Sequence, residues 1–146
     1  MYTEPLLSSA QVMTLAGITS RKGLKDLRDD MKMGRTRTGV PRPFSIVEAV
    51  VLTLAKRLIG EAGMRRAEAT AIAIQASQGV ADLLQHGEPM PQRWLTATRL
   101  RVAEIWFVAI VSDLSPLDNL EGFSRLAVDL TSVAKDVLDA VRSSSQ

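Results

Sequence analysis

The fold of this chain is decided by residues 8–45, which read SSAQVMTLAGITSRKGLKDLRDDMKMGRTRTGVPRPFS. Ser8 or Ser9 is suited to cap a first short helix, because a serine hydroxyl accepts from the free amides of a first helical turn. Gly17 ends this helix, and Thr19 or Ser20 caps a second one. The stretch therefore predicts two short helices joined by a tight corner, a helix-turn-helix.

The second predicted helix separates an apolar face from a basic one. Leu24, Leu27 and Met31 recur at helical spacing and are expected to point inward. The cations expected to point largely outward are Arg21, Lys22, Lys25 and Arg28. Gly23 weakens the helix by about 1 kcal/mol relative to alanine, so it marks either a close approach or a frayed turn.

After Met33 the pattern changes to cations alternating with small residues. Pro41 and Pro43 exclude a helix and fit a hairpin or an extended loop. A helix followed by a basic hairpin is the arrangement through which a winged helix contacts DNA. Residues 34–42 are therefore predicted to be the wing.

Ser45 and Glu48 form a Ser-x-x-Glu capping box at the start of a helix predicted over residues 46–63. This helix is apolar over most of its circumference, so it should be buried on more than one side and join the two halves of the chain. A further helix is predicted over residues 65–84, and the sequence HGEPMPQ then breaks the chain.

The remainder favours strands and a last helix. Strands are predicted over residues 94–98, 101–111 and 125–130, with a loop over residues 112–122. Thr131 is expected to cap a helix over residues 132–142, whose inward stripe is Ala134, Val137, Leu138 and Val141. The predicted fold class is α+β, with a winged helix-turn-helix in residues 1–64 and a small α/β dimerisation or effector lobe in residues 65–146.

The charge of the chain is divided unequally between its halves. Residues 1–66 carry 12 Lys or Arg and 6 Asp or Glu, whereas residues 67–146 carry 6 and 10. The halves are thus +6 and −4, which gives the formal net charge of +2. A basic first half suggests a polyanionic partner.

Several function classes are disfavoured by composition. The sequence has no cysteine, which removes thiolate metal sites and suits a reducing cytoplasm, the predicted location. The single histidine, His86, lies in a polar loop near Glu88, where a solvated side chain is more common than a general base. We therefore expect no enzyme activity, no catalytic residues, no metal and no cofactor. No segment has the roughly 20 apolar residues of a membrane span, so no membrane partner is expected.

Double-stranded DNA is the partner that the basic stretch predicts. Arg21, Lys22 and Lys25 would contact bases or phosphates from the second helix, because arginine and lysine are common donors to guanine. The wing cations would contact phosphates or the minor groove. The full set of predicted DNA-binding residues is Ser20, Arg21, Lys22, Lys25, Arg28, Arg35, Thr36, Arg37 and Arg42.

The segment LSSAQVMTLAGITS, the leucine-bearing LKDLR, and MGRTRTGVPRPFSIVEAVVLTLAKRLIGEAGM together resemble the DNA-binding module of MerR-type transcription regulators. The resemblance covers roughly the first 65 residues and includes Arg42-Pro43-Phe44-Ser45 at the opening of the third helix. It implies a recognition helix, a wing and binding of operator DNA as a homodimer. The chain departs from the family at Asp26 and Leu27, where an aromatic pair is usual, and it lacks the C-terminal coiled-coil helix and the cysteines of metal-sensing members.

Two interpretations are open for Trp94, Trp106 and Phe107. They line a small-molecule effector pocket, or they pack in the core or in a dimer interface. The second is favoured, because the strand that holds Trp106 and Phe107 is apolar on both faces and wants cover on each. A homodimer would supply that cover and would place two recognition helices on an inverted repeat.

The sequence thus predicts a bacterial or phage-type transcription regulator, a repressor in the simplest case. The alternative is a DNA-binding phage assembly, packaging or recombination accessory protein. A protein-binding module whose basic face meets an acidic partner is the third interpretation.

Overall fold

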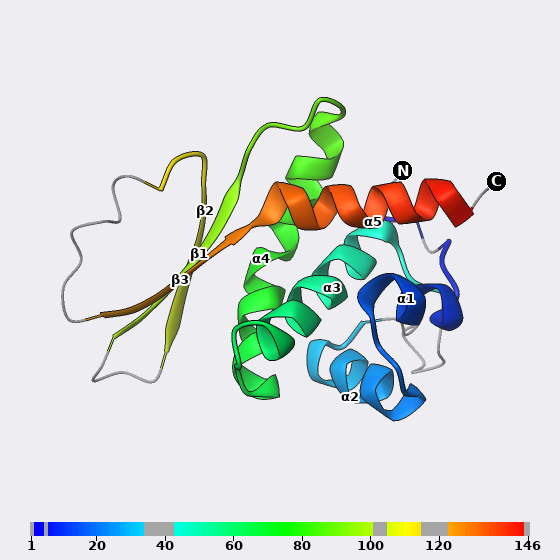
Figure 1. Cartoon of the computed structure of the whole chain (residues 1–146), viewed down its shortest axis with the longest axis horizontal. Helices are drawn as coiled ribbons and strands as arrows, with labels where there is room; N and C mark the ends of the chain where they lie inside the picture. Colours follow the sequence, from blue (N-terminus) through cyan, green and yellow to red (C-terminus); the bar gives the residue numbers. More distant parts are fainter. Residues whose placement is uncertain (1, 5, 34–42, 101–104, 115–122, 145–146) are drawn as a thin grey trace.

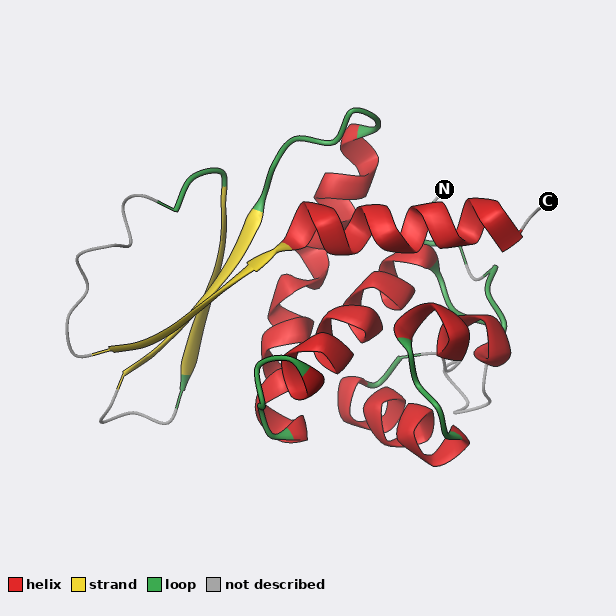
Figure 2. Ribbon diagram, in the orientation of Figure 1, coloured by secondary structure: helices red, strands yellow, loops and turns green. Residues whose placement is uncertain are grey.

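The computed structural model of the chain describes residues 2–4, 6–33, 43–100, 105–114 and 123–144. Its elements are α1 (Ser9–Ala16), α2 (Arg21–Met31), α3 (Ile46–Gly60), α4 (Arg66–His86), β1 (Trp94–Leu100), β2 (Trp106–Val111), β3 (Phe123–Asp129) and α5 (Leu130–Ser144). The predicted α+β class is confirmed. The helices gather on one side, and the sheet projects away from them (Figures 1 and 2).

The two predicted short helices and their corner are present. The Ser8 hydroxyl accepts from the third amide of α1, which identifies Ser8 as the cap. Gly17 ends α1 in the left-handed region at φ 71°, and the next amide, that of Ile18, returns to the carbonyl of Met13 at 2.9 Å. Ser20 caps α2. The corner is therefore held by local hydrogen bonds and by the buried side chain of Ile18.

The capping box predicted at the start of α3 is confirmed. The Glu48 amide donates to the Ser45 hydroxyl at 3.1 Å, and the Ser45 amide donates to the Glu48 carboxylate at 3.0 Å. Just before it, Phe44 and Leu7 form an antiparallel bridge, with the Phe44 amide 2.7 Å from the Leu7 carbonyl oxygen. The chain before α1 is thereby fastened to the start of α3.

The expected burial of α3 on more than one side is confirmed, because every residue from Ala49 to Ala55 is buried. α3 packs between α1, α4 and α5. The helix predicted over residues 65–84 is present as α4. Buried residues from α1 through α5 form a single hydrophobic cluster, which crosses the domain boundary predicted at residue 64.

The sheet is antiparallel with strand order β2-β1-β3. Its central strand pairs Ala97 with Val108 and Leu126, and this face packs on the helices. Contact with α4 is close at Gly79, where a Cβ atom would collide with the side chain of Ile110. The three predicted strands are present as β1, β2 and β3, but two of their predicted bounds are wrong: Ile105 precedes β2, and Leu130 is the first residue of α5 rather than the last of a strand. Residues 101–104 and 115–122 lie outside the described residues.

The second face of β2 is uncovered in the protomer. Phe107 keeps 56% of its surface exposed, whereas Trp106 and Val108 on either side of it pack against the core. The two faces of this strand are both apolar, as predicted, but the helices cover one of them. The face that holds Phe107 therefore remains open to solvent in the protomer.

The predicted cap of the last helix is wrong. α5 begins at Leu130, and the Ser132 amide donates to the Asp129 carboxylate at 3.0 Å. The Thr131 hydroxyl instead donates to the Pro91 carbonyl at 2.8 Å and accepts from the Arg93 amide at 2.8 Å. The inward stripe of α5 includes the predicted residues Ala134, Val137 and Leu138, which are buried, and Val141, which packs partly buried against the core.

Candidate nucleic-acid interface

The first turn of α2 is built around Ser20 and Gly23. The Gly23 amide donates to the Ser20 hydroxyl at 3.0 Å, which satisfies one of the free amides of the helix. A Cβ atom on Gly23 would lie 3.0 Å from the same oxygen. Gly23 therefore permits a close approach, and the turn is formed rather than frayed.

Arg21, Lys22 and Lys25 are exposed on this turn and the next. No acidic residue lies in the first turn of α2. Within the described part of the chain, no ion pair joins these three cations to a carboxylate. Their charges add to the positive end of the helix dipole, an unfavourable place for cations unless an anion binds there.

The opposite face of α2 is fixed by the core. Leu24, Leu27 and Met31 are all buried, as predicted. α2 contacts α1 and α4 through this face and its flanks. The basic face is therefore held outward. α2 itself lies in the helical body, apart from the sheet (Figure 1).

Arg28 differs from the other three cations of α2. Its side chain is half-buried, and its Nε atom is shielded from solvent with no hydrogen-bond partner among the described residues. It was expected to point largely outward. Arg28 lies one turn beyond Leu24, at the edge of the buried stripe, and this position accounts for the partial burial.

A group that sequence reasoning missed is Arg66, the first residue of α4. Its Nη1 atom lies 3.1 Å from Oδ2 of Asp26, and its Nε atom lies 2.8 Å from Oδ2 of Asp30. Both aspartates belong to α2. Their spacing of four residues on one helix was visible in the sequence, but the partner cation lies on another element.

The predicted wing residues Arg35, Thr36, Arg37 and Arg42 lie outside the described residues. The flanks of this segment are described. On one side the Met33 amide donates to the Arg28 carbonyl at 3.2 Å, and on the other Phe44 forms its bridge with Leu7. Met33 and Phe44 are thus both attached to the helical body that contains α2.

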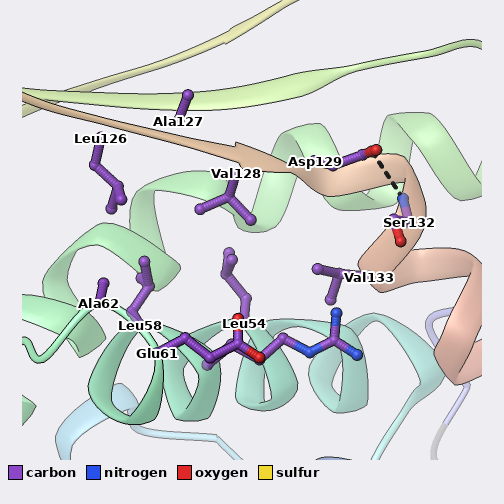
Figure 3. A pocket seen from close by; sticks show the side chains of 11 residues that line it. Leu54, Leu58, Glu61, Ala62, Leu126, Ala127, Val128, Asp129, Ser132 and Val133 are labelled. Atoms are coloured by element: carbon purple, nitrogen blue, oxygen red, sulfur yellow. Dashed lines mark hydrogen bonds between the residues drawn. The ribbon is translucent and has the colours of Figure 1, made fainter.

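An apolar hollow next to the sheet lies between α3, β3 and the start of α5 (Figure 3). Its volume is about 370 Å³, within the range of small-molecule sites. Leu54, Leu58 and Val128 contribute apolar surface, and the nearby Asp129 carboxylate is already engaged by the Ser132 amide. The aromatic residues considered for an effector pocket do not line it.

Those aromatic residues do not converge on one site. In β2, Trp106 and Phe107 are neighbours and point to opposite faces of the sheet. Trp94 lies on β1 and pairs with Val111, which places it on the same face as Phe107. Trp106 packs against the core and donates to Glu68.

The residues considered for catalysis are also placed. His86 ends α4 and is exposed, and Glu88 accepts from Arg142 at 2.7 Å. Among the described residues, no group of three or more His, Cys, Asp or Glu side chains is arranged to hold a metal ion. In the same residues, no helix is both long and apolar enough to cross a membrane.

A comparison with protein-family models finds no match, and a comparison with curated proteins finds none either. The resemblance to MerR-type regulators therefore rests on the residues quoted for it.

Proposed function

We propose that this protein is a sequence-specific DNA-binding transcription regulator, in the simplest case a repressor, that binds an inverted-repeat operator as a homodimer. Its DNA-binding module would be a winged helix-turn-helix of the MerR type, with α2 as the recognition helix and residues 34–42 as the wing. It would act in the bacterial cytoplasm, at the nucleoid.

The observation that carries this proposal is the arrangement of α2. Arg21, Lys22 and Lys25 are exposed at the positive end of a capped helix whose opposite face is buried. Because the buried face fixes the rotation of this helix, its cations must face solvent. Lysine and arginine side chains in that position can bind DNA phosphates and the acceptor groups of guanine.

The homodimer is supported by the sheet. β2 lies at an edge of the sheet, its six residues carry no charge and no proline, and Phe107 leaves its outer face apolar. Edge strands of this kind usually acquire a partner, because charge or proline otherwise protects them. A second copy that packed at this edge and covered the face of Phe107 would place two α2 helices symmetrically.

Salt-dependent binding tests the proposal. With three phosphate contacts from the α2 helix of each of two protomers, the logarithm of the association constant should fall with the logarithm of salt concentration with a slope of about −5, and contacts from the wing would make the slope steeper. A mixed-sequence duplex and a genomic fragment pool serve as probes. Absence of binding, or an affinity insensitive to salt, would overturn the proposal.

The same fragment pool distinguishes a regulator from the alternative, a phage packaging or recombination accessory protein. A regulator should select one two-fold symmetric site with a preference of about 10³-fold or more over bulk DNA. Binding without such a preference would favour the accessory protein.

A further inference from the structure

Three charged side chains join α2 to the start of α4. Arg66 contacts Asp26 at 3.1 Å through Nη1 and Asp30 at 2.8 Å through Nε. The two aspartates are four residues apart on α2, so their carboxylates lie on one face and repel each other. The planar guanidinium reaches the two carboxylates from two different nitrogen atoms, in a fixed geometry that a single lysine ammonium nitrogen does not reproduce.

The place of Arg66 is not explained by the stability of its own helix. It is the first residue of α4, where a cation faces the positive end of the helix dipole. About half of the Arg66 side chain and a third of each aspartate side chain are exposed. Ion pairs this exposed contribute little to folding. The role of Arg66 should therefore lie in restraining the two aspartates, and the relevant question is which cation they would contact if Arg66 were removed.

Asp26 lies four residues after Lys22 on α2, a spacing at which opposite charges on a helix surface pair. Lys22 makes no ion pair among the described residues, while Asp26 is directed to Arg66. Without Arg66, the freed Asp26 carboxylate would be able to reach Lys22 and would add negative charge beside the surface that faces phosphates.

We infer that Arg66 is a positioning residue for DNA binding. By holding Asp26 and Asp30 against α4, it keeps Lys22 unpaired and available to a phosphate or a base, and it does so without contacting DNA itself. This inference rests on the proposed function, because it assigns α2 to the DNA interface.

Binding of a mixed-sequence duplex at about 0.1 M salt tests the inference, because one phosphate contact contributes roughly tenfold to affinity at that salt concentration. In Arg66→Ala, each protomer should lose the contact of Lys22 with DNA, and each lost contact should weaken DNA binding by roughly tenfold. Adding Asp26→Asn to Arg66→Ala should restore most of the affinity, since a neutral side chain cannot form an ion pair with Lys22. A purely structural role would instead appear as a loss of stability in Arg66→Ala, caused by repulsion between Asp26 and Asp30, that accompanies the loss of affinity. Denaturant unfolding of each variant measures this stability, which we expect to stay near that of the wild type.

Arg57→Ala is the matched control. It removes one positive charge and one ion pair, that of Arg57 with Asp136 at 2.9 Å, on α3 and α5 rather than on α2. We expect the DNA affinity of Arg57→Ala to stay within about twofold of that of the wild type, because this substitution frees no carboxylate to pair with a cation of α2.

Arg66→Ala binding like the wild type, or an affinity that Asp26→Asn fails to restore, would overturn the inference. If Arg66→Ala does not fold, Arg66→Gln with and without Asp26→Asn provides the same comparison. Failure of the wild type itself to bind DNA would instead overturn the proposed function.

Discussion

The indole of Trp106 donates a hydrogen bond of 2.8 Å to the carboxylate of Glu68. Trp106 belongs to β2 and Glu68 to the first turn of α4, so this bond ties the edge of the sheet to the helical body. Arg65 donates to the other carboxylate oxygen at 2.8 Å, and Arg99 of β1 lies 4.0 Å from the oxygen that Trp106 contacts. One carboxylate thus receives donors from its own turn and from the sheet.

This arrangement predicts a pH dependence of stability. The hydrogen bonds from Arg65 and then from Trp106 lower the pKa of Glu68 from its ordinary value of 4.5. Because the folded state has the lower pKa, the stabilisation is complete above the unfolded pKa and is lost as pH falls through the folded pKa. We expect the free energy of unfolding to decrease below a pH of about 4.5, measured by urea unfolding with tryptophan fluorescence.

Glu68→Gln should remove this part of the acid-induced loss, because glutamine does not titrate. Trp106→Phe should reduce this acid-induced loss of stability by a smaller amount, because it removes only the second hydrogen-bond donor to Glu68 and leaves Arg65 in place. An unchanged pH profile in Glu68→Gln would show that other carboxylates cause the loss.

Substitution of Gly79 tests how closely the sheet packs on α4. Alanine in a helix is favoured over glycine by about 1 kcal/mol, yet a Cβ atom here would collide with Cδ1 of Ile110. We expect Gly79→Ala to destabilise the protein by roughly 1–3 kcal/mol, measured by denaturant unfolding. Ile110→Val removes Cδ1, so the double variant should be more stable than the two single effects predict.

Gly60→Ala is the control for this comparison. Gly60 is the last residue of α3, and a Cβ atom there would meet nothing within 4 Å. This substitution should stabilise the protein by about 0.5 kcal/mol. If Gly79→Ala stabilises to the same extent, α4 and β2 are farther apart than the structure places them.

The sequence predicted those parts of the fold that depend on neighbours in the chain. The caps at Ser8 and Ser45 bond to amides three residues away, so their patterns identify α1 and α3 directly. The bonds of Thr131 to Arg93 and of Trp106 to Glu68 each span 38 residues. No local pattern reports such a pairing, and this is why Thr131 was mistaken for a cap.

The candidate site also contains features that local sequence patterns predict and features that depend on tertiary packing. The exposed cations Arg21, Lys22 and Lys25 and the buried leucines of α2 follow from helical periodicity. The contact of Arg66 with Asp26 depends on how α4 packs beside α2, which periodicity does not contain.

A second capping box is present at α1, where the Ser8 amide donates to the Gln11 side chain at 2.8 Å. The boxes at Ser8 and Ser45 predict different losses on substitution by alanine. Ser45 is buried at the bridge between Leu7 and Phe44, whereas Ser8 is exposed at the start of α1. Ser45→Ala should cost about 1–2 kcal/mol and Ser8→Ala about 0.5–1 kcal/mol, because water replaces a lost cap at the exposed site. Denaturant unfolding measures both. A larger loss for Ser8→Ala would contradict the assigned burial.

Phe107 predicts the location of the proposed dimer interface. Its side chain is 56% exposed on the uncovered face of β2, and a charge there would be desolvated if a second copy covered the sheet. We expect Phe107→Glu to raise the dimer dissociation constant by about 30-fold or more, as truncation of a hot-spot aromatic residue does. Sedimentation over a range of concentrations measures the change.

Ile74→Glu is the matched control, because Ile74 is an apolar residue of α4 with 44% of its surface exposed and does not belong to the sheet. Its dimer dissociation constant should remain near that of the wild type. If the dimer forms through β2, Phe107→Glu should also weaken binding to an inverted repeat while leaving binding to a single half-site unchanged, since each protomer keeps its own α2. A wild-type protein that stays monomeric at all concentrations, or a Phe107→Glu variant that dimerises normally, would exclude this face as the interface.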